Sequence, residues 1–118
     1  VHINGIGSHA PQWRELDTTT MKRAQIITDQ TAACLAEAGD LLIPIEEGDL
    51  NESDIYAELG EIVAGKKPGR RNEKERIIDF NYGLAIEDVA MAMEIYTRAT
   101  AQGVGTVMPL MEGDLPYA

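Results

Sequence analysis

Residues 5–17 contain the side chains whose types and spacing are best suited to chemistry. Gly5 and Gly7 follow a short apolar segment, and glycines in such a turn permit a positive φ or the close approach of a flat ligand. His9 follows them at the expected carboxyl end of a strand, where open α/β sheets place their ligands. Because an imidazole exchanges protons near neutral pH, His9 is a candidate acid–base group. A histidine that only forms part of a pocket wall fits the same pattern.

The same glycines raise the alternative of a phosphate-binding turn. Gly5, Gly7 and Ala10 satisfy the pattern G-x-G-x-x-A, and Asp29 ends the next expected strand at the distance typical of a ribose-binding acid. In that arrangement a helix opens at the third position and directs its N-terminus at the pyrophosphate. Residues 11–23 lack a helical period, and Asp17 begins a new element within them. The sequence therefore argues against a phosphate-binding turn here.

The elements that must position these residues alternate between strands and helices. We expect strands at residues 1–6, 25–28 and 77–80 and an edge strand at 106–110. We expect helices from Asp17 as N-cap, at 30–38 ended by Gly39, from about 51 to Gly65, and at 84–102 with a Glu94–Arg98 pair. Pro44 favours a loop or single turn at 41–45, and residues 66–76 read as a solvated, charged loop. This alternation predicts an α/β fold with a doubly wound parallel sheet.

Composition limits the classes of partner. The chain has 118 residues, with 10 Lys and Arg against 20 Asp and Glu, so its net charge of −10 argues against nucleic-acid and membrane surfaces. Cys34 is the only cysteine, so neither an intrachain disulfide nor a cysteine-based zinc site can form. We expect Cys34 to be a small core residue, no metal site, and a cytoplasmic setting. The chain begins at Val1, inside an expected strand, which favours a piece of a longer protein.

Six segments, in order, resemble the ornithine cyclodeaminase/mu-crystallin family, most closely its mu-crystallin and archaeal alanine dehydrogenase-like branches. The resemblance extends to about Gly105. The similar segments are Ile3-Asn4-Gly5-Ile6-Gly7, Pro11-Gln12-Trp13-Arg14-Glu15-Leu16-Asp17, Ile27-Thr28-Asp29, Glu37-Ala38-Gly39-Asp40, residues 58–65 and Gly83-Leu84-Ala85-Ile86-Glu87-Asp88.

The resemblance implies a two-domain protein that uses NAD or NADP, of which this chain is the C-terminal part. Residues 1–83 would form the second half of a Rossmann-like sheet. Residues 84–118, a long helix and a terminal strand, would lead back to the substrate and dimerisation domain of a homodimer. It also implies that the cofactor is contacted by Gly5, Ile6, Gly7, Ser8, Trp13 and Asn81, and that Tyr82 faces the substrate.

Related cyclodeaminases and alanine dehydrogenases carry an aspartate where this chain has His9, which disfavours ornithine cyclodeamination. The resemblance therefore favours hydride transfer between a nicotinamide and the α-carbon of a small amino acid or its imine. By itself the 118-residue piece is expected to be inactive. The alternative is a non-catalytic, NAD(P)H-dependent binding protein of the mu-crystallin type for a small ligand.

Overall fold

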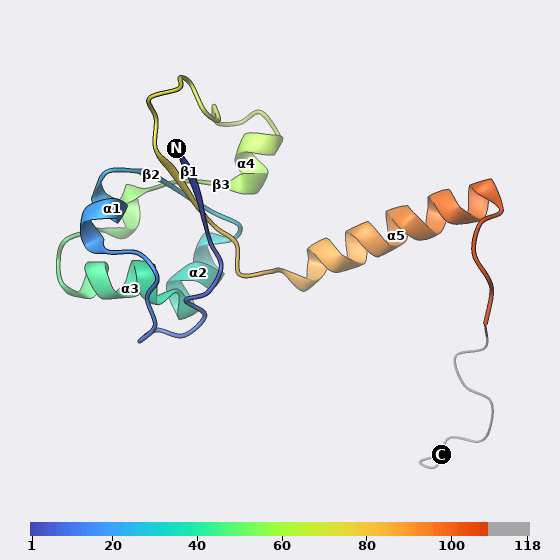
Figure 1. Cartoon of the computed structure of the whole chain (residues 1–118), viewed down its shortest axis with the longest axis horizontal. Helices are drawn as coiled ribbons and strands as arrows, with labels where there is room; N and C mark the ends of the chain where they lie inside the picture. The colour runs from blue at the N-terminus through green and yellow to red at the C-terminus, as the bar shows by residue number, and fades with distance from the viewer. Residues whose placement is uncertain (109–118) are drawn as a thin grey trace, which may run out of the picture. The chain divides into compact units, whose positions relative to one another are not determined.

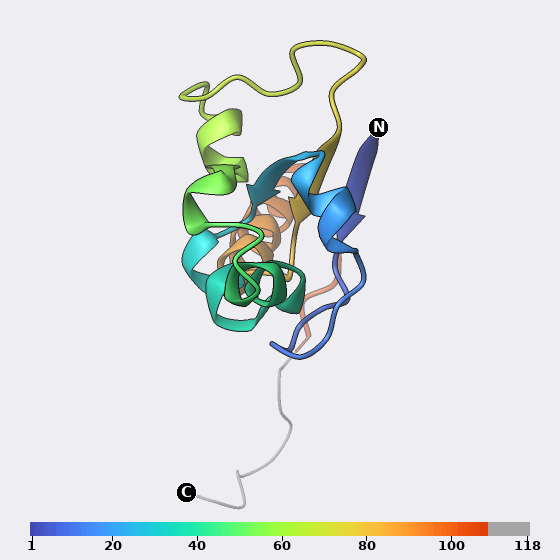
Figure 2. The same cartoon turned by 90° about the vertical axis from the view of Figure 1, so that its left-hand side faces the viewer.

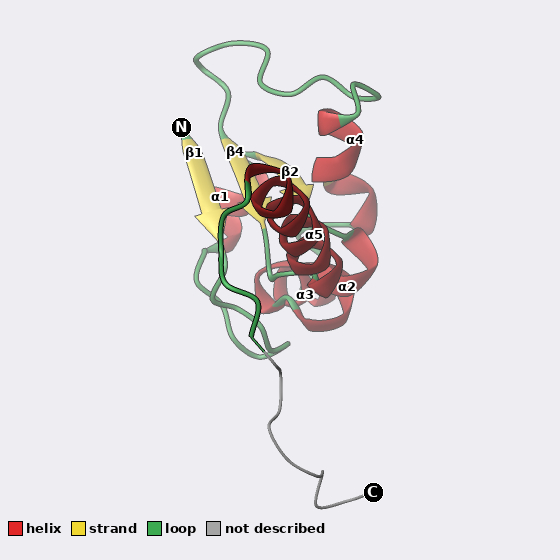
Figure 3. Ribbon diagram, turned by 90° about the vertical axis from the view of Figure 1, so that its right-hand side faces the viewer, coloured by secondary structure: helices red, strands yellow, loops and turns green. Residues whose placement is uncertain are grey.

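Four short parallel strands form the centre of the fold in the computed structural model, which describes residues 1–108. The strands are β1 (His2–Gly5), β2 (Gln25–Thr28), β3 (Ile55–Glu58) and β4 (Ile77–Phe80), in the spatial order β1-β4-β2-β3 (Figure 1). Figure 3 shows β1, β4 and β2 side by side and running in one direction. The α/β class and the parallel sheet are therefore confirmed.

Helices connect the strands and cover the sheet. They are α1 (Thr18–Lys22), α2 (Thr31–Glu37), α3 (Gly39–Glu46), the 3-10 turn η1 (Glu52–Asp54) and α4 (Leu59–Val63); a further helix, α5 (Ala85–Gln102), follows β4. Met21 of α1, Cys34 of α2 and Leu41 of α3 pack in one core cluster with Ile78 and Phe80 of β4. Because Ile78 and Phe80 are two residues apart, they point to the same face of the sheet, which α1, α2 and α3 therefore cover.

The two ends of the sheet carry different loops. The charged loop 66–76 leads into the start of β4, whereas the loop after β1 lies at the opposite end (Figure 2). Asp17 caps α1 by accepting a hydrogen bond from the N–H of Thr20 at 2.9 Å, as predicted. Hydrogen bonds from the hydroxyl and backbone of Thr20 hold the pKa of the Asp17 carboxyl below its usual range. This cap ends the long loop that carries the candidate site.

The predicted loop at residues 41–45 is wrong, because Pro44 lies inside α3. Gly39 does not end the preceding helix but begins α3. Leu41 and Pro44 are buried in α3, and this burial offsets the single backbone hydrogen bond that proline cannot donate. The carbonyl of Pro44 accepts the N–H groups of Asp49 and Leu50, which turns the chain out of the helix.

The helix predicted from residue 51 is also wrong in its first half. This segment forms η1, then β3, and only then α4, which ends before Gly65 as predicted. Ile55 and Leu59 share a helical spacing, but Ala57 between them is buried as β3 pairs with β2. Pairing with a distant strand thus overrides the local period.

The structure divides into two compact units, Val1–Leu84 and a second beginning at Ala85. The second contains α5, in which Glu94 and Arg98 form the predicted pair at 2.6 Å. Residues 106–108 are not a strand, and 109–110 of the predicted edge strand lie outside the described residues. Within residues 1–108, no helix has the length and apolar character needed to cross a membrane.

Candidate functional site

The carboxyl ends of β1 and β4 meet at one edge of the sheet. The two strands are neighbours in register, with Gly5 opposite Phe80, and the N–H of Asn81 donates to the carbonyl of Gly5 at 3.1 Å. A methyl group on Gly5 would lie 2.6 Å from the ring of Phe80, so this close pairing requires glycine. The turn after β1 and the turn after β4 are therefore adjacent, as the expected shared site requires.

A hydroxyl pair joins the two turns. The side-chain oxygens of Ser8 and Tyr82 lie 2.6 Å apart, and Ser8 is fully buried. The ring of Tyr82 stacks on that of Phe80, with centroids 6.0 Å apart. Burial raises the pKa of the Tyr82 phenol, so the tyrosine stays neutral at physiological pH. Ser8 and Tyr82 thus join the turn after β1 to the turn after β4 through their hydroxyl groups.

His9 follows Ser8, is exposed, and is held in one orientation by two contacts. Its Nδ1 lies 2.9 Å from the carbonyl oxygen of Gly7, and its ring meets the indole of Trp13 edge-on, with centroids 4.8 Å apart. Because a carbonyl only accepts, Nδ1 carries the proton in this contact and Nε2 can exchange a proton with a bound molecule. Trp13 itself is 51% exposed. This geometry is compatible with acid–base chemistry at Nε2.

Asp29 fixes the turn after β4 from the end of β2. Its Oδ2 accepts the N–H groups of Tyr82 at 2.9 Å and Gly83 at 3.3 Å, and its Oδ1 accepts that of Gln30 at 2.6 Å. Asp29 is only 9% exposed. Both oxygens are therefore committed to the protein, and the structure does not bring Asp29 to a ribose. Residues 11–16 form no helix, so the phosphate-binding turn is absent here as well.

Cys34 donates its S–H to Oδ1 of Asp29 at 3.2 Å and is fully buried, as the core assignment predicted. Burial, together with the Asp29 carboxylate, raises the pKa of the thiol to about 12. Thiolate is the reactive form, so the folded protein is expected to resist iodoacetamide at pH 8 and to react once unfolded in urea. Mass spectrometry of labelled protein measures this difference. Rapid stoichiometric labelling of the folded chain would contradict it.

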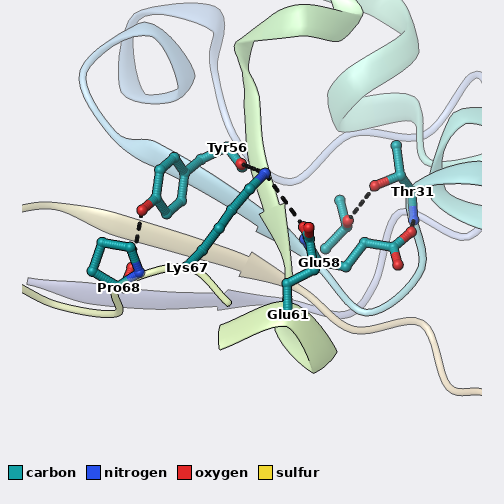
Figure 4. Close-up of polar contacts among 7 residues, drawn as sticks. Thr31, Tyr56, Glu58, Glu61, Lys67 and Pro68 are labelled. Atoms are coloured by element: carbon teal, nitrogen blue, oxygen red, sulfur yellow. Dashed lines mark hydrogen bonds and ion pairs between the residues drawn. The ribbon is translucent and has the colours of Figure 1, made fainter. Parts of the chain in front are cut away.

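Glu58 is the last residue of β3, and Glu61 lies one helical turn further along, in α4 (Figure 4). Oε1 of Glu58 accepts the N–H of Thr31 at the start of α2, at 2.8 Å. Oε2 of Glu61 accepts the N–H of Glu58 and lies 3.3 Å from Nζ of Lys67. The N–H of Glu58 holds the pKa of Glu61 below its usual value, assisted by Lys67. Both carboxylates therefore stabilise the fold around β3.

Gly39 connects α3 to the loop that carries His9. Its N–H donates to the carbonyl of Ser8 at 3.3 Å, and an added Cβ would collide with the carbonyl of Trp13 and lie 2.8 Å from that of Pro11. Both neighbours are backbone atoms, so Gly39→Ala must displace the loop and is expected to cost about 1–3 kcal/mol of unfolding free energy. Urea unfolding measures this cost.

Gly60 in α4 is the matched control for Gly39, because a Cβ there meets nothing within 4 Å. Alanine is the better helix former, so Gly60→Ala is expected to be neutral or to stabilise by up to about 1 kcal/mol. Equal effects at the two positions would show that the loop does not depend on close contact at Gly39.

The structure brings Gly5, Gly7, His9 and Asn81 to one edge of the sheet, with Trp13 against His9. Sequence reasoning missed the two acidic residues that hold the loop, Glu15 and Asp40. Glu15 accepts the N–H of Gly7, and Asp40 accepts that of Glu15. Asp40 had a detectable signal: it precedes the apolar run 41–45, and a carboxylate buried there needs hydrogen-bond donors.

Comparison with known proteins adds a consistent set of similarities. The profile of the ornithine cyclodeaminase/mu-crystallin family matches residues 1–103. A Delta(1)-pyrroline-2-carboxylate reductase of Bacillus cereus is 41% identical over 106 residues, which cover 89% of this chain and 33% of the reductase. Ketimine reductase mu-crystallin of Rattus norvegicus is 42% identical over 95 residues, covering 80% of this chain and 28% of that protein.

A solved structure shares the fold as well. It is Thermococcus litoralis Delta(1)-pyrroline-2-carboxylate reductase in complex with NADH and L-proline, with a TM-score of 0.80 and 43% identity. The match covers 91% of this chain and 33% of that one, and the sheet described above is accordingly Rossmann-like. The chain spans about a third of the length of the curated reductases it matches.

Proposed function

The chain belongs to the ornithine cyclodeaminase/mu-crystallin family, and on that premise we propose that it forms part of an NAD(P)-dependent oxidoreductase. The reaction is hydride transfer between the nicotinamide and the α-carbon of a small amino acid or its imine. In this proposal, residues 1–83 complete the dinucleotide-binding sheet. Residues 84–118 lead to a substrate and dimerisation domain of a cytoplasmic homodimer. A cyclic imine is the favoured substrate class, because the chain is similar to a Delta(1)-pyrroline-2-carboxylate reductase and to a ketimine reductase.

The observation that carries the proposal is the meeting of the turns after β1 and β4. Gly7 and His9 from one turn and Asn81 from the other lie at the same carboxyl edge, where doubly wound sheets bind dinucleotides. A second half of such a sheet serves the nicotinamide end rather than the pyrophosphate. The missing phosphate-binding turn in residues 5–16 agrees with that division.

The residues present fit a flat, partly apolar ring. Gly7 has no side chain in the turn, and Ile6 and Trp13 on the same loop are 66% and 51% exposed, so two large apolar side chains are accessible to a ligand. We assign contact with the nicotinamide to Ile6, Gly7, Trp13 and Asn81, whereas Gly5 and Ser8, which the sequence also suggested, are buried and shape the turn instead. When bound, the nicotinamide supplies or accepts the hydride.

In this account His9 handles the proton that accompanies the hydride. Reduction of an imine adds hydride to carbon and a proton to nitrogen, and in this proposal Nε2 of protonated His9 donates that proton. In the reverse direction it accepts the proton from the amine. Tyr82 closes the substrate side of the site, held there by Ser8.

The test uses protein expressed from the complete reading frame that encodes this chain. Purified protein is mixed with NADH or NADPH and either a five- or six-membered cyclic imino acid or pyruvate with ammonia. Loss of the reduced-nicotinamide absorbance with an imino substrate is the expected result. Tight NAD(P)H binding without turnover across the panel would support the non-catalytic binding protein. Absence of binding would contradict both.

A further inference from the structure

The turn that carries the candidate site is occupied by a carboxylate from its own chain. Oε2 of Glu15 accepts the N–H of Gly7 at 2.7 Å and that of Ile6 at 3.3 Å. Two successive N–H groups that converge on one oxygen form a small anion-binding nest. A side chain on Gly7 would collide with this same carboxylate. The absence of a side chain on Gly7 therefore leaves room for the carboxylate of Glu15.

The backbone of Glu15 is itself fixed by a second carboxylate. Oδ1 of Asp40 accepts the N–H groups of Glu15 at 2.8 Å and Leu16 at 2.7 Å. Asp40 is fully buried, and its Oδ2 has no hydrogen-bond partner among residues 1–108. A buried carboxylate oxygen without a hydrogen-bond donor lowers the stability of the folded state. Holding the loop in place would not by itself favour such a residue.

The two carboxylates are linked to His9 through one residue, Gly7. Its N–H donates to Glu15, and its carbonyl accepts from Nδ1 of His9 at 2.9 Å. Release of the Glu15 contact frees the Gly7 N–H, so the backbone that orients the imidazole loses one of its restraints. A continuous series of hydrogen bonds thus runs from α3 to the proposed acid–base group.

We propose that Glu15, held by Asp40, is a positioning residue that fixes the Gly5–Ser8 turn and the orientation of His9. The inference rests on the function proposed above, and it adds that this carboxylate acts on catalysis through His9. Glu15 touches neither substrate nor cofactor in this role. Its contribution is therefore expected to disappear when His9 is absent.

A double-mutant cycle in the complete protein tests the proposal. Glu15→Ala is expected to lower kcat by about 10- to 100-fold, the scale of small misplacements of reacting groups. Glu15→Gln retains an acceptor oxygen and is expected to recover part of the loss. In a His9→Ala background, Glu15→Ala is expected to change kcat less than twofold, because groups that act as a unit are not additive. Glu46→Ala, at an exposed carboxylate in α3, is the control and keeps wild-type kcat.

Full additivity in the cycle, or a Glu15→Ala enzyme with wild-type kcat, would overturn the proposal. A second readout is independent of turnover: amide hydrogen exchange of Ile6 and Gly7 in cofactor-free protein. Glu15→Ala is expected to speed exchange at these two amides about tenfold over wild type, with the amides of β4 unchanged. Unchanged exchange at Ile6 and Gly7 overturns the positioning role even if no substrate is found. Faster amide exchange in Glu15→Ala, in a protein that shows no turnover, supports the role of Glu15 in fixing the turn and refutes the proposed reaction.

Discussion

Replacing His9 by alanine is expected to lower kcat of the complete protein by about 10²- to 10⁴-fold, the usual contribution of a general acid–base group. The imidazole is exposed at the sheet edge, with Nδ1 bound to the carbonyl of Gly7 and Nε2 left for the substrate. Cofactor affinity is expected to change little, because the assigned nicotinamide contacts come mainly from the turn and Trp13. Steady-state kinetics with a cyclic imino acid, together with an NADH titration, measure the two effects separately.

Two further variants sharpen the His9 prediction. His9→Asp supplies another proton-exchanging side chain at this position, so it is expected to recover part of the kcat that His9→Ala loses. His2→Ala is the matched control, because His2 is an exposed histidine on β1 outside the turn. If His9→Ala retains kcat within about twofold of wild type, the histidine is only a wall of the pocket.

Asp29→Ala is expected to lower the free energy of unfolding by about 3 kcal/mol or more. The carboxylate accepts hydrogen bonds from the backbone N–H groups of Gln30, Tyr82 and Gly83 in a nearly buried setting. Alanine removes this charged acceptor, and hydrogen bonds to charged groups contribute about 1.5–3 kcal/mol each. Because Tyr82 is in the turn after β4, the variant also loosens the site. Urea unfolding followed by circular dichroism measures the change.

The control for Asp29 is Asp49, an aspartate whose interaction is at the surface. Oδ1 of Asp49 lies 2.7 Å from Nζ of Lys22, and both side chains are about half exposed. Exposed ion pairs contribute about 0–1 kcal/mol, so Asp49→Ala is expected to have a small effect. Comparable losses at Asp29 and Asp49 would argue that Asp29 does not hold the sheet edge together.

Elements with strong local signals were predicted closely. The strands at 25–28 and 77–80 and the long helix ending at 102 coincide with β2, β4 and α5. The errors lie where distant contacts decide the structure. Residues 55–58 become a strand because β2 supplies a pairing partner, and Pro44 is tolerated in α3 because Pro44 and Leu41 are buried there. Neither the strand pairing nor the burial can be read from the local spacing of apolar residues.

The candidate site also has a part that the sequence predicts and a part that depends on distant contacts. The convergence of Gly7, His9 and Asn81 follows from their positions after two parallel strands, and so it could be expected from the sequence. The residues that hold those turns could not. Glu15 is joined to Asp40 across 25 residues, and Asp29 to Tyr82 across 53. Such pairs depend on how the strands are ordered, and β4 inserts between β1 and β2 against the order of the chain.

A crystal structure of the complete protein with NADH tests the central claim most directly. The account predicts that the nicotinamide ring contacts the backbone of Gly7, with His9 and Asn81 at the same pocket. A nicotinamide bound elsewhere, with these three residues left in solvent, would contradict it.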